Sequence, residues 1–524
     1  MSNHQQRLMK RAATTAALAL CAGFALAVGA AAGGGGTDVR VNDPSLDPPG
    51  AVQNETALAV HGQTICAGFN DLVPGGVTGF ARSSDLGTSW TDNGSTGQGS
   101  DPSIAVHEAS GTFYYAAIAN IGGLSAIGVA NSTDDCQTLS SFVSATPASS
   151  TQGDIEDKPW IAVDSTGGPR DGNVYVCWDH FHNYPSLDSD IRFSASLDGG
   201  TSFVREQVIS PANAVYPFGC HIDVGPGGEV YVTWTSVAPG DFSINFRRSR
   251  DGGQSWDPPV RVNSQPTRHP GIDRVTACGP EIRPTLNGDI RMLHGTWMAV
   301  DTTGGPLDGN IYVVWAHDPL GATDNSDVFF STSRNAGSSW SPQLQVAGGT
   351  LTDQFEPFVE VGGEGTVSIA WYDRRDDAAN NLDINVYATF SRDGGGTLDP
   401  LTRLSDVSFP PIVVPYCYMG EYIAVAGDAD NFYYAWGDNR DGDPNVYFDL
   451  ATAPALAPAP PGDVDCDRNI GAIDALLVLQ RVAALLNSLD CEANADVGGT
   501  PGVDSVDALL ILQYTAGLIS SLPP

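Results

Sequence analysis

Short apolar strands alternate with polar turns along most of this chain. A run of the type Ile-Ala-Val is followed by a turn and then by a second strand ending in an aromatic residue, as in HIDVGPGGEVYVTW and FVEVGGEGTVSIAW. Such apolar runs bounded by turn residues are typical of β-strands. The arrangement occurs seven times between residues 37 and 450, and one tryptophan position recurs in five of the units: Trp178, Trp234, Trp315, Trp371 and Trp436.

A short polar phrase also recurs. SRDGGQSW, residues 249–256, has near-copies that begin at Ser83, Ser196, Ser333 and Ser391. Its Asp can accept backbone N–H groups and its Gly permits positive φ, so the phrase predicts a turn. In the copy at Ser333, Asn335 replaces the Asp, which leaves the chemistry of a turn intact. We therefore interpret the phrase as structural rather than catalytic, with Trp90, Trp256 and Trp340 packing between neighbouring units.

Four strand-like segments in each of seven units predict a mainly β protein, a seven-bladed β-propeller; six blades is the alternative. In each blade the Ile-Ala-Val run is the inner strand and the tryptophan strand is the second. The last unit lacks an outer strand. The N-terminal VRVNDPS resembles RVNSQPT, which follows the phrase of the fourth unit, so we expect the N-terminus to supply that strand and close the ring.

The five copies of Ser-x-Asp-x-Gly-x-Ser-Trp resemble the Asp-box (BNR) repeat of sialidase-like propellers. The resemblance implies boxes between the third and fourth strands of each blade and a ligand site on the opposite face. It also implies glycoside hydrolase chemistry, with three arginines, a Tyr activated by a Glu, and an Asp acid/base. The Arg-Ile-Pro sequence of that family does not occur early in this chain, so catalysis and the catalytic residues stay open.

The ligand mouth is expected where inner strands begin and second strands end. Polar residues occupy these positions, and a concave, carboxylate-rich mouth is a reasonable site for extracellular carbohydrate or a glycoconjugate. The alternative is hydrated loop ends with local ion pairs. The residues assigned to the mouth are Glu55, Asp101, Asp157, His221, Glu356, Asp373, Arg375, Glu421, Asp438 and Arg440.

The interval between Trp234 and Trp315 is longer than the other intervals. Its extra sequence, PTRHPGIDRVTACGPEIRPTLNGDIRMLHGTW, is expected to lie over the mouth. It is either a lid or specificity loop or a disulfide-tethered decoration.

Residues 1–32 have a basic start and an Ala-rich apolar run, which predict a secretory signal peptide; a retained anchor is the alternative. No later stretch is apolar enough to span a membrane. Eight cysteines then remain, an even number that favours disulfides in a secreted, extracellular protein. The pairing of Cys66, Cys136, Cys177, Cys220, Cys278 and Cys417 is left open. The net charge of −36 argues against nucleic acid as a partner.

A Pro/Ala-rich linker, residues 451–462, precedes a small all-α module, residues 463–524. There the amphipathic helix IDALLVLQRVAAL repeats as VDALLILQYTAGL, each after an acidic loop. The first loop has the spacing of an EF-hand-like calcium site, and the second is a weaker version; a charged turn before a helix is the alternative. The predicted calcium ligands are Asp463, Asp465, Asp467, Asn469 and Asp474 in the first loop and Asp496, Asp504 and Asp507 in the second.

The paired loop–helix repeats resemble a type I dockerin, which implies calcium as cofactor and a cohesin-like protein as partner. Cys466 and Cys491 are the best candidates for a disulfide beside the two loops. Two functions are therefore weighed. The first is a sialidase-like glycoside hydrolase in polysaccharide catabolism, attached through its tail. The second is a non-catalytic extracellular propeller that binds glycans or proteins.

Overall fold

The computed structural model describes residues 37–522. Excepted are residues 48–49, 73–76, 148–150, 185–187, 239–240, 265–267, 279–280, 293–294, 320–323, 349, 413–416, 430, 454–459, 466–469, 490 and 500. The predicted signal peptide, Cys466, Asp467, Asn469 and half of the predicted linker lie outside the described residues.

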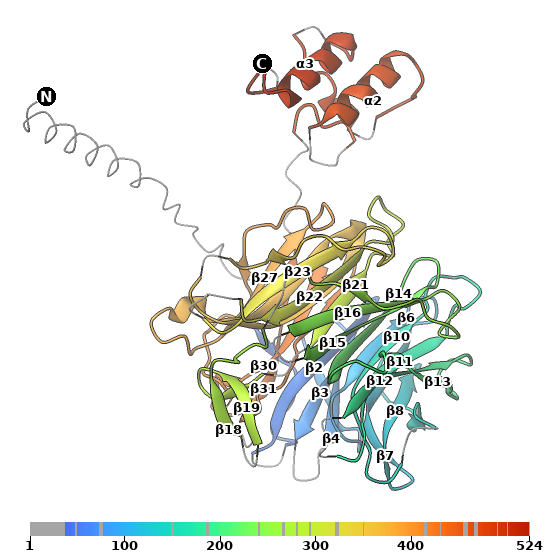
Figure 1. Cartoon of the computed structure of the whole chain (residues 1–524), viewed down its shortest axis with the longest axis vertical. Helices are drawn as coiled ribbons and strands as arrows, with labels where there is room; N and C mark the ends of the chain where they lie inside the picture. Colours follow the sequence, from blue (N-terminus) through green and yellow to red (C-terminus); the bar gives the residue numbers. More distant parts are fainter. Residues whose placement is uncertain are drawn as a thin grey trace, which may run out of the picture.

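Seven four-stranded antiparallel sheets follow one another along the chain (Figure 1). The first three are β2 (Val52–His61), β3 (Thr64–Leu72), β4 (Val77–Ser83) and β5 (Thr91–Ser95); β6 (Ser103–His107), β7 (Thr112–Ile121), β8 (Leu124–Ser132) and β9 (Val143–Ser144); and β10 (Ile155–Val163), β11 (Val174–Phe181), β12 (Ser189–Ser196) and β13 (Val204–Val208). The next two are β14 (Pro217–Val224), β15 (Val230–Ala238), β16 (Asp241–Ser249) and β17 (Val260–Arg261); and β21 (Thr296–Val300), β22 (Ile311–His317), β23 (Asp327–Ser333) and β24 (Leu344–Gln345). The last two are β25 (Gln354–Val361), β26 (Val367–Asp373), β27 (Asn385–Ser391) and β28 (Thr402–Arg403); and β29 (Ala424–Gly427), β30 (Asn431–Asp438) and β31 (Asn445–Thr452) with β1 (Val39–Arg40).

The inner strands of neighbouring sheets contact one another in the closed order β2, β6, β10, β14, β21, β25, β29 and back to β2. This is the arrangement of a propeller, and the seven sheets agree with the seven predicted units. In five of the seven blades a tryptophan of the second strand fills the space between blades. Trp178, Trp234, Trp315, Trp371 and Trp436 are all fully buried. Burying such large side chains is a main contribution to the stability of each blade.

The N-terminal strand β1 closes the ring, as predicted from VRVN. Val39 lies opposite Phe448 and Arg40 opposite Tyr447 in β31. The matching strand of the fourth sheet, β17, starts with the same Val-Arg pair. In both sheets the asparagine two residues after this arginine accepts a backbone amide of the third strand. Asn42 Oδ1 accepts the amide of Val446 at 2.9 Å, and Asn263 Oδ1 accepts that of Ile244 at 2.8 Å.

The recurring phrase is a turn between third and fourth strands, as predicted. In the fourth sheet Asp251 Oδ1 accepts the amide of Ser255 at 2.8 Å, and Ser249 Oγ accepts the amide of Gly253 at 2.8 Å. Gly253 has φ of 81°, and a Cβ there would lie 2.1 Å from the ring of Phe193 in the preceding sheet. Trp256 packs edge-on against the same ring, with centroids 5.1 Å apart. The predicted packing of this tryptophan between blades is thus confirmed.

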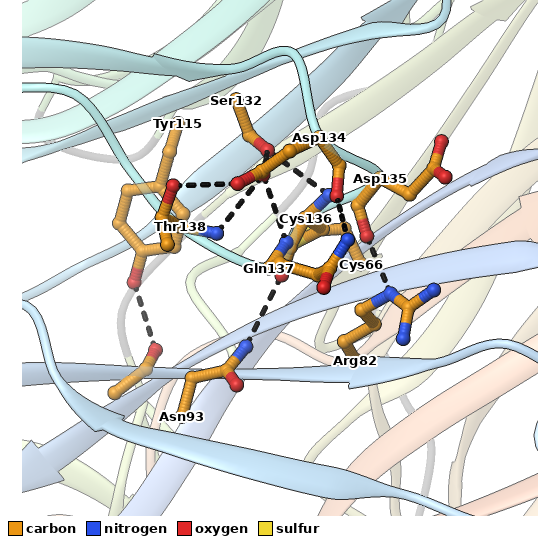
Figure 2. The surroundings of a disulfide bond; sticks show 11 residues. Cys66, Arg82, Asn93, Tyr115, Ser132, Asp134, Asp135, Cys136, Gln137 and Thr138 are labelled. Carbon is orange, nitrogen blue, oxygen red and sulfur yellow. Dashed lines mark hydrogen bonds between the residues drawn. A yellow bond between two sulfur atoms is a disulfide. The ribbon is translucent and has the colours of Figure 1, made fainter.

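In the second sheet a disulfide takes the place of this glycine contact. Residues 132–136, Ser-Thr-Asp-Asp-Cys, are a degenerate copy of the phrase. Cys136 occupies the glycine position, has φ of 59°, and donates its amide to Ser132 Oγ at 3.0 Å. Its sulfur bonds Cys66 in β3 of the first sheet. Figure 2 shows Arg82 and Asn93 of the first sheet beside the same turn, where they donate to backbone carbonyls at 2.6 and 3.1 Å. The degenerate copy of the phrase therefore keeps its turn and gains a covalent link between blades.

Two further disulfides join Cys177 to Cys220 and Cys278 to Cys417, and Cys491 is also disulfide-bonded. Such bonds are typical of proteins from an oxidising compartment. Cys278 belongs to an inserted three-stranded sheet of β18 (Val275–Cys278), β19 (Glu281–Leu286) and β20 (Ile290–Arg291). Among the residues that the structure describes there are also three short 3₁₀ turns, η1 (Gly363–Gly365), η2 (Arg375–Asp377) and η4 (Glu492–Asn494), the last of them in the C-terminal part.

The C-terminal part is helical, with α2 (Ala472–Val482) and α3 (Ser505–Thr515) packed on each other (Figure 1). Its core contains residues at matching places in the two repeats: Val464 with Val497, Ala475 with Ala508, and Val478 with Ile511. The duplicated sequence thus folds as two loop–helix units around one small core. In the part of the chain that the structure describes, neither of these helices has the length and apolar character needed to cross a membrane.

Candidate functional site

The mouth of the channel is built at irregular starts of the inner strands. Pairing with the second strand shifts register near the beginning of β2, β10, β14 and β25. In β2, β10 and β25, and just before β6, a charged residue adopts positive φ at this place: Glu55 (50°), Lys158 (45°), Glu356 (48°) and Asp101 (60°), whereas β14 has Gly219 (65°). Side chains other than glycine are strained in this region, and such strain is concentrated at functional sites. Equivalent positions in four blades therefore carry charged side chains at the same end of the ring.

Lys158 is the centre of this cluster. Its Nζ donates to Glu55 Oε1 at 3.2 Å and to Asp101 Oδ2 at 3.3 Å, and it contacts Glu421 Oε2. Burial disfavours the ammonium form, but the carboxylates outweigh burial and raise the pKa of Lys158 well above its usual value. One lysine thus holds together carboxylates from the first, second and seventh blades.

The inserted sheet adds a second cation. Arg291 Nη2 lies 2.8 Å from Glu421 Oε1, and its guanidinium stacks on the Tyr418 ring at 4.5 Å. The disulfide between Cys278 and Cys417 ties the insertion to the segment that carries Tyr418 and Glu421. The insertion is therefore both disulfide-tethered and part of the mouth.

Asn70, where β3 approaches its end, fixes the other side of the cluster. Its amide nitrogen donates to Glu55 Oε2 at 2.9 Å and to the Tyr418 hydroxyl at 3.1 Å, and its oxygen accepts the amide of Asp101 at 2.7 Å. These bonds hold the acidic side chains in one arrangement, as preorganised sites require.

A cavity of about 260 Å³ lies among these groups, close to the lower end of the range for small-ligand sites. Its lining is mainly polar and consists of Leu72, Ser100, Asp101, Asp157, Lys158, Arg291, Tyr418 and Glu421. The cavity therefore offers carboxyl, ammonium, guanidinium and hydroxyl groups to one bound molecule.

Two carboxyl groups of this cavity have opposite pKa shifts. Burial, together with the negative charge of Asp101, raises the pKa of Asp157 to about 7. Burial acts in the same direction on Asp101, but Lys158 and a hydrogen bond from Glu55 outweigh it and lower the pKa of Asp101. An acid that keeps its proton near neutral pH beside an ionised carboxylate is the arrangement that acid–base catalysis needs.

Two other predicted mouth residues lie close to the axis of the ring. Burial raises the pKa of Glu356 well above its usual value, and the charges of Glu421 and Glu55 add to this. His221 packs on Trp160 with ring centroids 4.6 Å apart, and burial lowers its pKa to about 3, so the imidazole is neutral. Trp160 also packs on Phe358 at 5.8 Å. These rings form an aromatic layer beneath the acidic cluster.

Beyond the aromatic layer, a larger cavity of about 580 Å³ follows the inner strands to the end that carries the Asp-box turns. It is lined by two more carboxyl groups, the partly buried Asp223 and Glu360, whose pKa values desolvation raises to about 7 and about 8. The channel thus has two chemically different ends.

The remaining predicted mouth residues form pairs within their own blades. Asp373 Oδ2 accepts from Arg375 Nη2 at 2.6 Å and from Trp371 Nε1 at 2.7 Å. The equivalent pair in the seventh blade is Asp438 with Arg440, at 2.5 Å. The arginines also stack on tyrosines of the third strands, Tyr387 and Tyr447, at 4.8 and 4.0 Å. The parallel between WYDRR and WGDNR therefore corresponds to a shared local ion pair.

The sequence interpretation did not select Lys158, Arg291 and Tyr418 as site residues. The sequence did contain a signal for Lys158. The chain has two lysines, and Lys158 precedes a proline at the start of an inner strand, as Asp101 and Glu356 do. Nothing in the sequence indicated that the insertion would place Arg291 beside Glu421.

In the C-terminal part, Asp463, Asp465 and Asp474 come together, each offering an oxygen within 4.8 Å of the others. Asp463 and Asp474 are buried, and three carboxyl groups at this spacing offer the kind of hard oxygen ligands that calcium takes. In the second loop the carboxylates accept backbone amides: Asp496 from Gly502 at 2.8 Å, Asp504 from Val506 at 2.6 Å and Asp507 from Val497 at 2.9 Å.

Comparisons with known proteins give distant structural similarity. No protein-family model matches the chain, and no curated protein matches it. A Dyadobacter fermentans protein of unknown function is 11% identical with a TM-score of 0.43, covering 79% of this chain and 98% of its own. The α-L-arabinofuranosidase of Fusarium graminearum, solved with arabinobiose, is 11% identical with a TM-score of 0.42, covering 80% and 98%. A Hadza microbial sialidase is 12% identical with a TM-score of 0.40, covering 73% and 74%.

Proposed function

We propose that the protein is a secreted carbohydrate-active propeller that cleaves glycosidic bonds in the mouth around Lys158. The observation that carries this proposal is the pair of carboxyl groups with opposite pKa shifts in one cavity, Asp157 and Asp101. Asp157 is the general acid that protonates the leaving oxygen. Asp101 and Glu421, both contacted by Lys158, are the carboxylates available as base or nucleophile.

The charge of the mouth favours a neutral sugar. Lys158 and Arg291 are already engaged with carboxylates. Burial raises the pKa values of Glu55, Asp157 and Glu356, and Asp101 and Glu421 pair with the two cations, so no cation of the cluster is left to bind the carboxylate of an acidic sugar. Arg375 and Arg440, which would be needed to clamp a sugar carboxylate, pair within their own blades. Neutral glycosides are therefore the substrate class that this site fits.

The test is product release from a panel of neutral and acidic fluorogenic glycosides and polysaccharides. Cleavage of neutral members, abolished by Glu421→Gln, is the expected result. Binding of glycans without any product would support the alternative, a non-catalytic glycan-binding propeller. Cleavage confined to acidic sugars would contradict the charge argument.

For the C-terminal part we propose calcium-dependent attachment to a partner protein of the cohesin type. The observation that favours it is a row of exposed apolar side chains at matching places in the two helices. These are Ile473 (63% exposed) with Val506 (50%), Leu476 (52%) with Leu509 (53%), and Leu479 (43%) with Leu512 (41%). Exposed apolar patches of this kind are typical of protein interaction sites. Calcium at Asp463, Asp465 and Asp474 would stabilise the helices that present this row.

This second proposal is tested on the full chain by following ellipticity at 222 nm, because α2 and α3 are the α-helices of the described part. Calcium is expected to raise the melting temperature of this signal. Asp463→Asn should remove most of the rise, whereas Asp496→Asn, at the matching place in the second loop, should keep most of it. A melting curve unchanged by calcium would overturn the calcium site.

A further inference from the structure

Two histidines and an aspartate meet at the rim of the third blade, in a group that the proposed hydrolytic site does not use. Asp154 precedes β10, His180 lies in β11, and His182 follows that strand. Each offers a ligand atom within 4.8 Å of the others. The rings of His180 and His182 are edge to face, with centroids 4.5 Å apart.

The distance between His180 Nε2 and Asp154 Oδ2 is 3.8 Å, too long for a hydrogen bond. Two ligands bound at about 2.1 Å to one tetrahedral ion are about 3.4 Å apart. The two groups thus face each other at nearly the separation that a shared metal ion imposes. A shift of a few tenths of an ångström would bring the two ligand atoms to that separation.

The other nitrogen of each histidine is held by a carboxylate. His180 Nδ1 lies 2.9 Å from Glu156 Oε2, which also accepts from Trp178 Nε1 at 2.6 Å; all three side chains are buried. His182 Nε2 lies 2.8 Å from Asp190 Oδ2. A carboxylate on the far nitrogen of a histidine fixes the ring orientation and increases its basicity, which is the usual outer sphere of metal-binding histidines.

Asp154 is oriented as well. Its Oδ1 accepts the amide of Asn183 at 2.9 Å, and its Oδ2 accepts from the Thr151 hydroxyl. His180 is 1% exposed and His182 is 35% exposed, so the group is anchored on the protein side and open on the solvent side. An ion could enter from solvent, and three protein ligands would leave a position for water.

We propose that Asp154, His180 and His182 bind one divalent transition-metal ion of the zinc class. Imidazole ligands favour zinc-like ions over calcium, which prefers oxygen alone. Asp154 comes just before β10, the strand that carries the mouth residues Asp157 and Lys158. A bound ion fixes the start of this strand, so the site is a positioning element for the mouth, separate from the acidic loops of the C-terminal part.

The test uses the untagged full chain, stripped of metal and kept in excess calcium so that the C-terminal loops do not compete. One zinc ion per chain is expected by elemental analysis after dialysis, and cobalt in its place should give visible absorption bands of a low-coordinate nitrogen–oxygen site. His182→Ala and Asp154→Asn should each weaken zinc binding at least about tenfold. His182 is partly exposed, so its replacement leaves the fold intact.

The matched control is His107→Ala. His107 also faces a carboxylate, with Nε2 3.3 Å from Asp171 Oδ2, but it lacks the second histidine of the proposed site. This variant should keep full zinc stoichiometry. The proposal is overturned if the wild-type chain takes up no stoichiometric zinc, or if His182→Ala and His107→Ala bind it equally well.

Discussion

The Nζ atom of Lys158 lies 3.2 Å from Oε1 of Glu55, although 103 residues separate them in the chain. This contact joins the third blade to the first across the mouth of the channel. It is possible because each residue sits at the irregular start of an inner strand, with φ of 45° and 50°. The ring of blades thus brings charged side chains from several blades together near its central axis.

Removing this ammonium should destabilise the protein in a pH-dependent way. In Lys158→Met, the buried carboxyl groups of Glu55, Asp101 and Glu421 lose their shared cation, which is expected to lower the free energy of unfolding by about 3 kcal/mol at pH 8. At pH 5 the loss should be smaller, because the carboxyl groups can take up protons instead. Urea unfolding at both pH values measures the difference. Lys158→Arg is the control that retains the charge, and an equal loss in both variants would show that packing rather than charge is responsible.

The carboxyl groups of the larger cavity predict a free energy of unfolding that falls as pH rises. The pKa of Asp223 is raised by burial to about 7, against about 3.9 in the unfolded chain. The folded state therefore holds this proton over a range in which the unfolded state has lost it. The resulting stabilisation is present at low pH and is lost as pH rises through 7, by at most roughly 4 kcal/mol because Asp223 is only partly buried. Asp223→Asn should flatten the dependence of the urea midpoint on pH between about pH 4 and pH 7.

An Asp-box carboxylate gives the control of opposite sign. Hydrogen bonds from Ser255 and Ser249 outweigh burial and lower the pKa of Asp251 to about 2. The stabilisation that the Asp251 carboxylate provides is present above the pKa of Asp in the unfolded chain and is lost as pH falls below that value. Asp251→Asn should therefore leave the slope above about pH 5 unchanged. If both variants changed that slope alike, the assignment of the slope to buried channel carboxyl groups would be wrong.

The Asp-box glycines should be needed for close packing as well as for backbone conformation. Gly253→Ala would bring Cβ to 2.1 Å from Phe193, at φ of 81°. Gly304 has a similar φ of 72° but no atom within 4 Å of the added Cβ. Gly304→Ala is expected to cost about 1 kcal/mol from backbone strain alone, and Gly253→Ala about 2–4 kcal/mol because overpacking is added. Equal losses by chemical denaturation would mean that the ring contact is unimportant.

The blades could be counted from the sequence because their signals are local. Strand pairs, tryptophan positions and box turns each lie within a short stretch, and the N-terminal strand carried the same Val-Arg-Val-Asn as the outer strand it matches. The disulfides could not be paired in this way, because they link residues 43, 70 and 139 positions apart through contacts between blades or with the insertion.

The mouth was predictable only in outline. Glu55, Asp101, Asp157 and Glu421 were placed at starts of inner strands, and the structure brings them together. Asp373, Arg375, Asp438 and Arg440 were grouped with them, but they lie at the ends of second strands, one strand farther from the axis, and pair locally. Sequence position alone does not distinguish these two distances from the axis. The role of Arg291 depends on how the inserted sheet folds back, which no periodic pattern encodes.

The central claim is that Asp157 is the acid of a hydrolytic site, and the specificity constant kcat/KM for the best neutral glycoside tests it most directly. Asp157→Asn is compared with Glu360→Gln, which removes a partly buried carboxyl with a raised pKa from the larger cavity. We expect Asp157→Asn to lower kcat/KM by about 100-fold or more while Glu360→Gln leaves it unchanged. Retention of activity in Asp157→Asn, or an equal loss in both variants, would contradict this account.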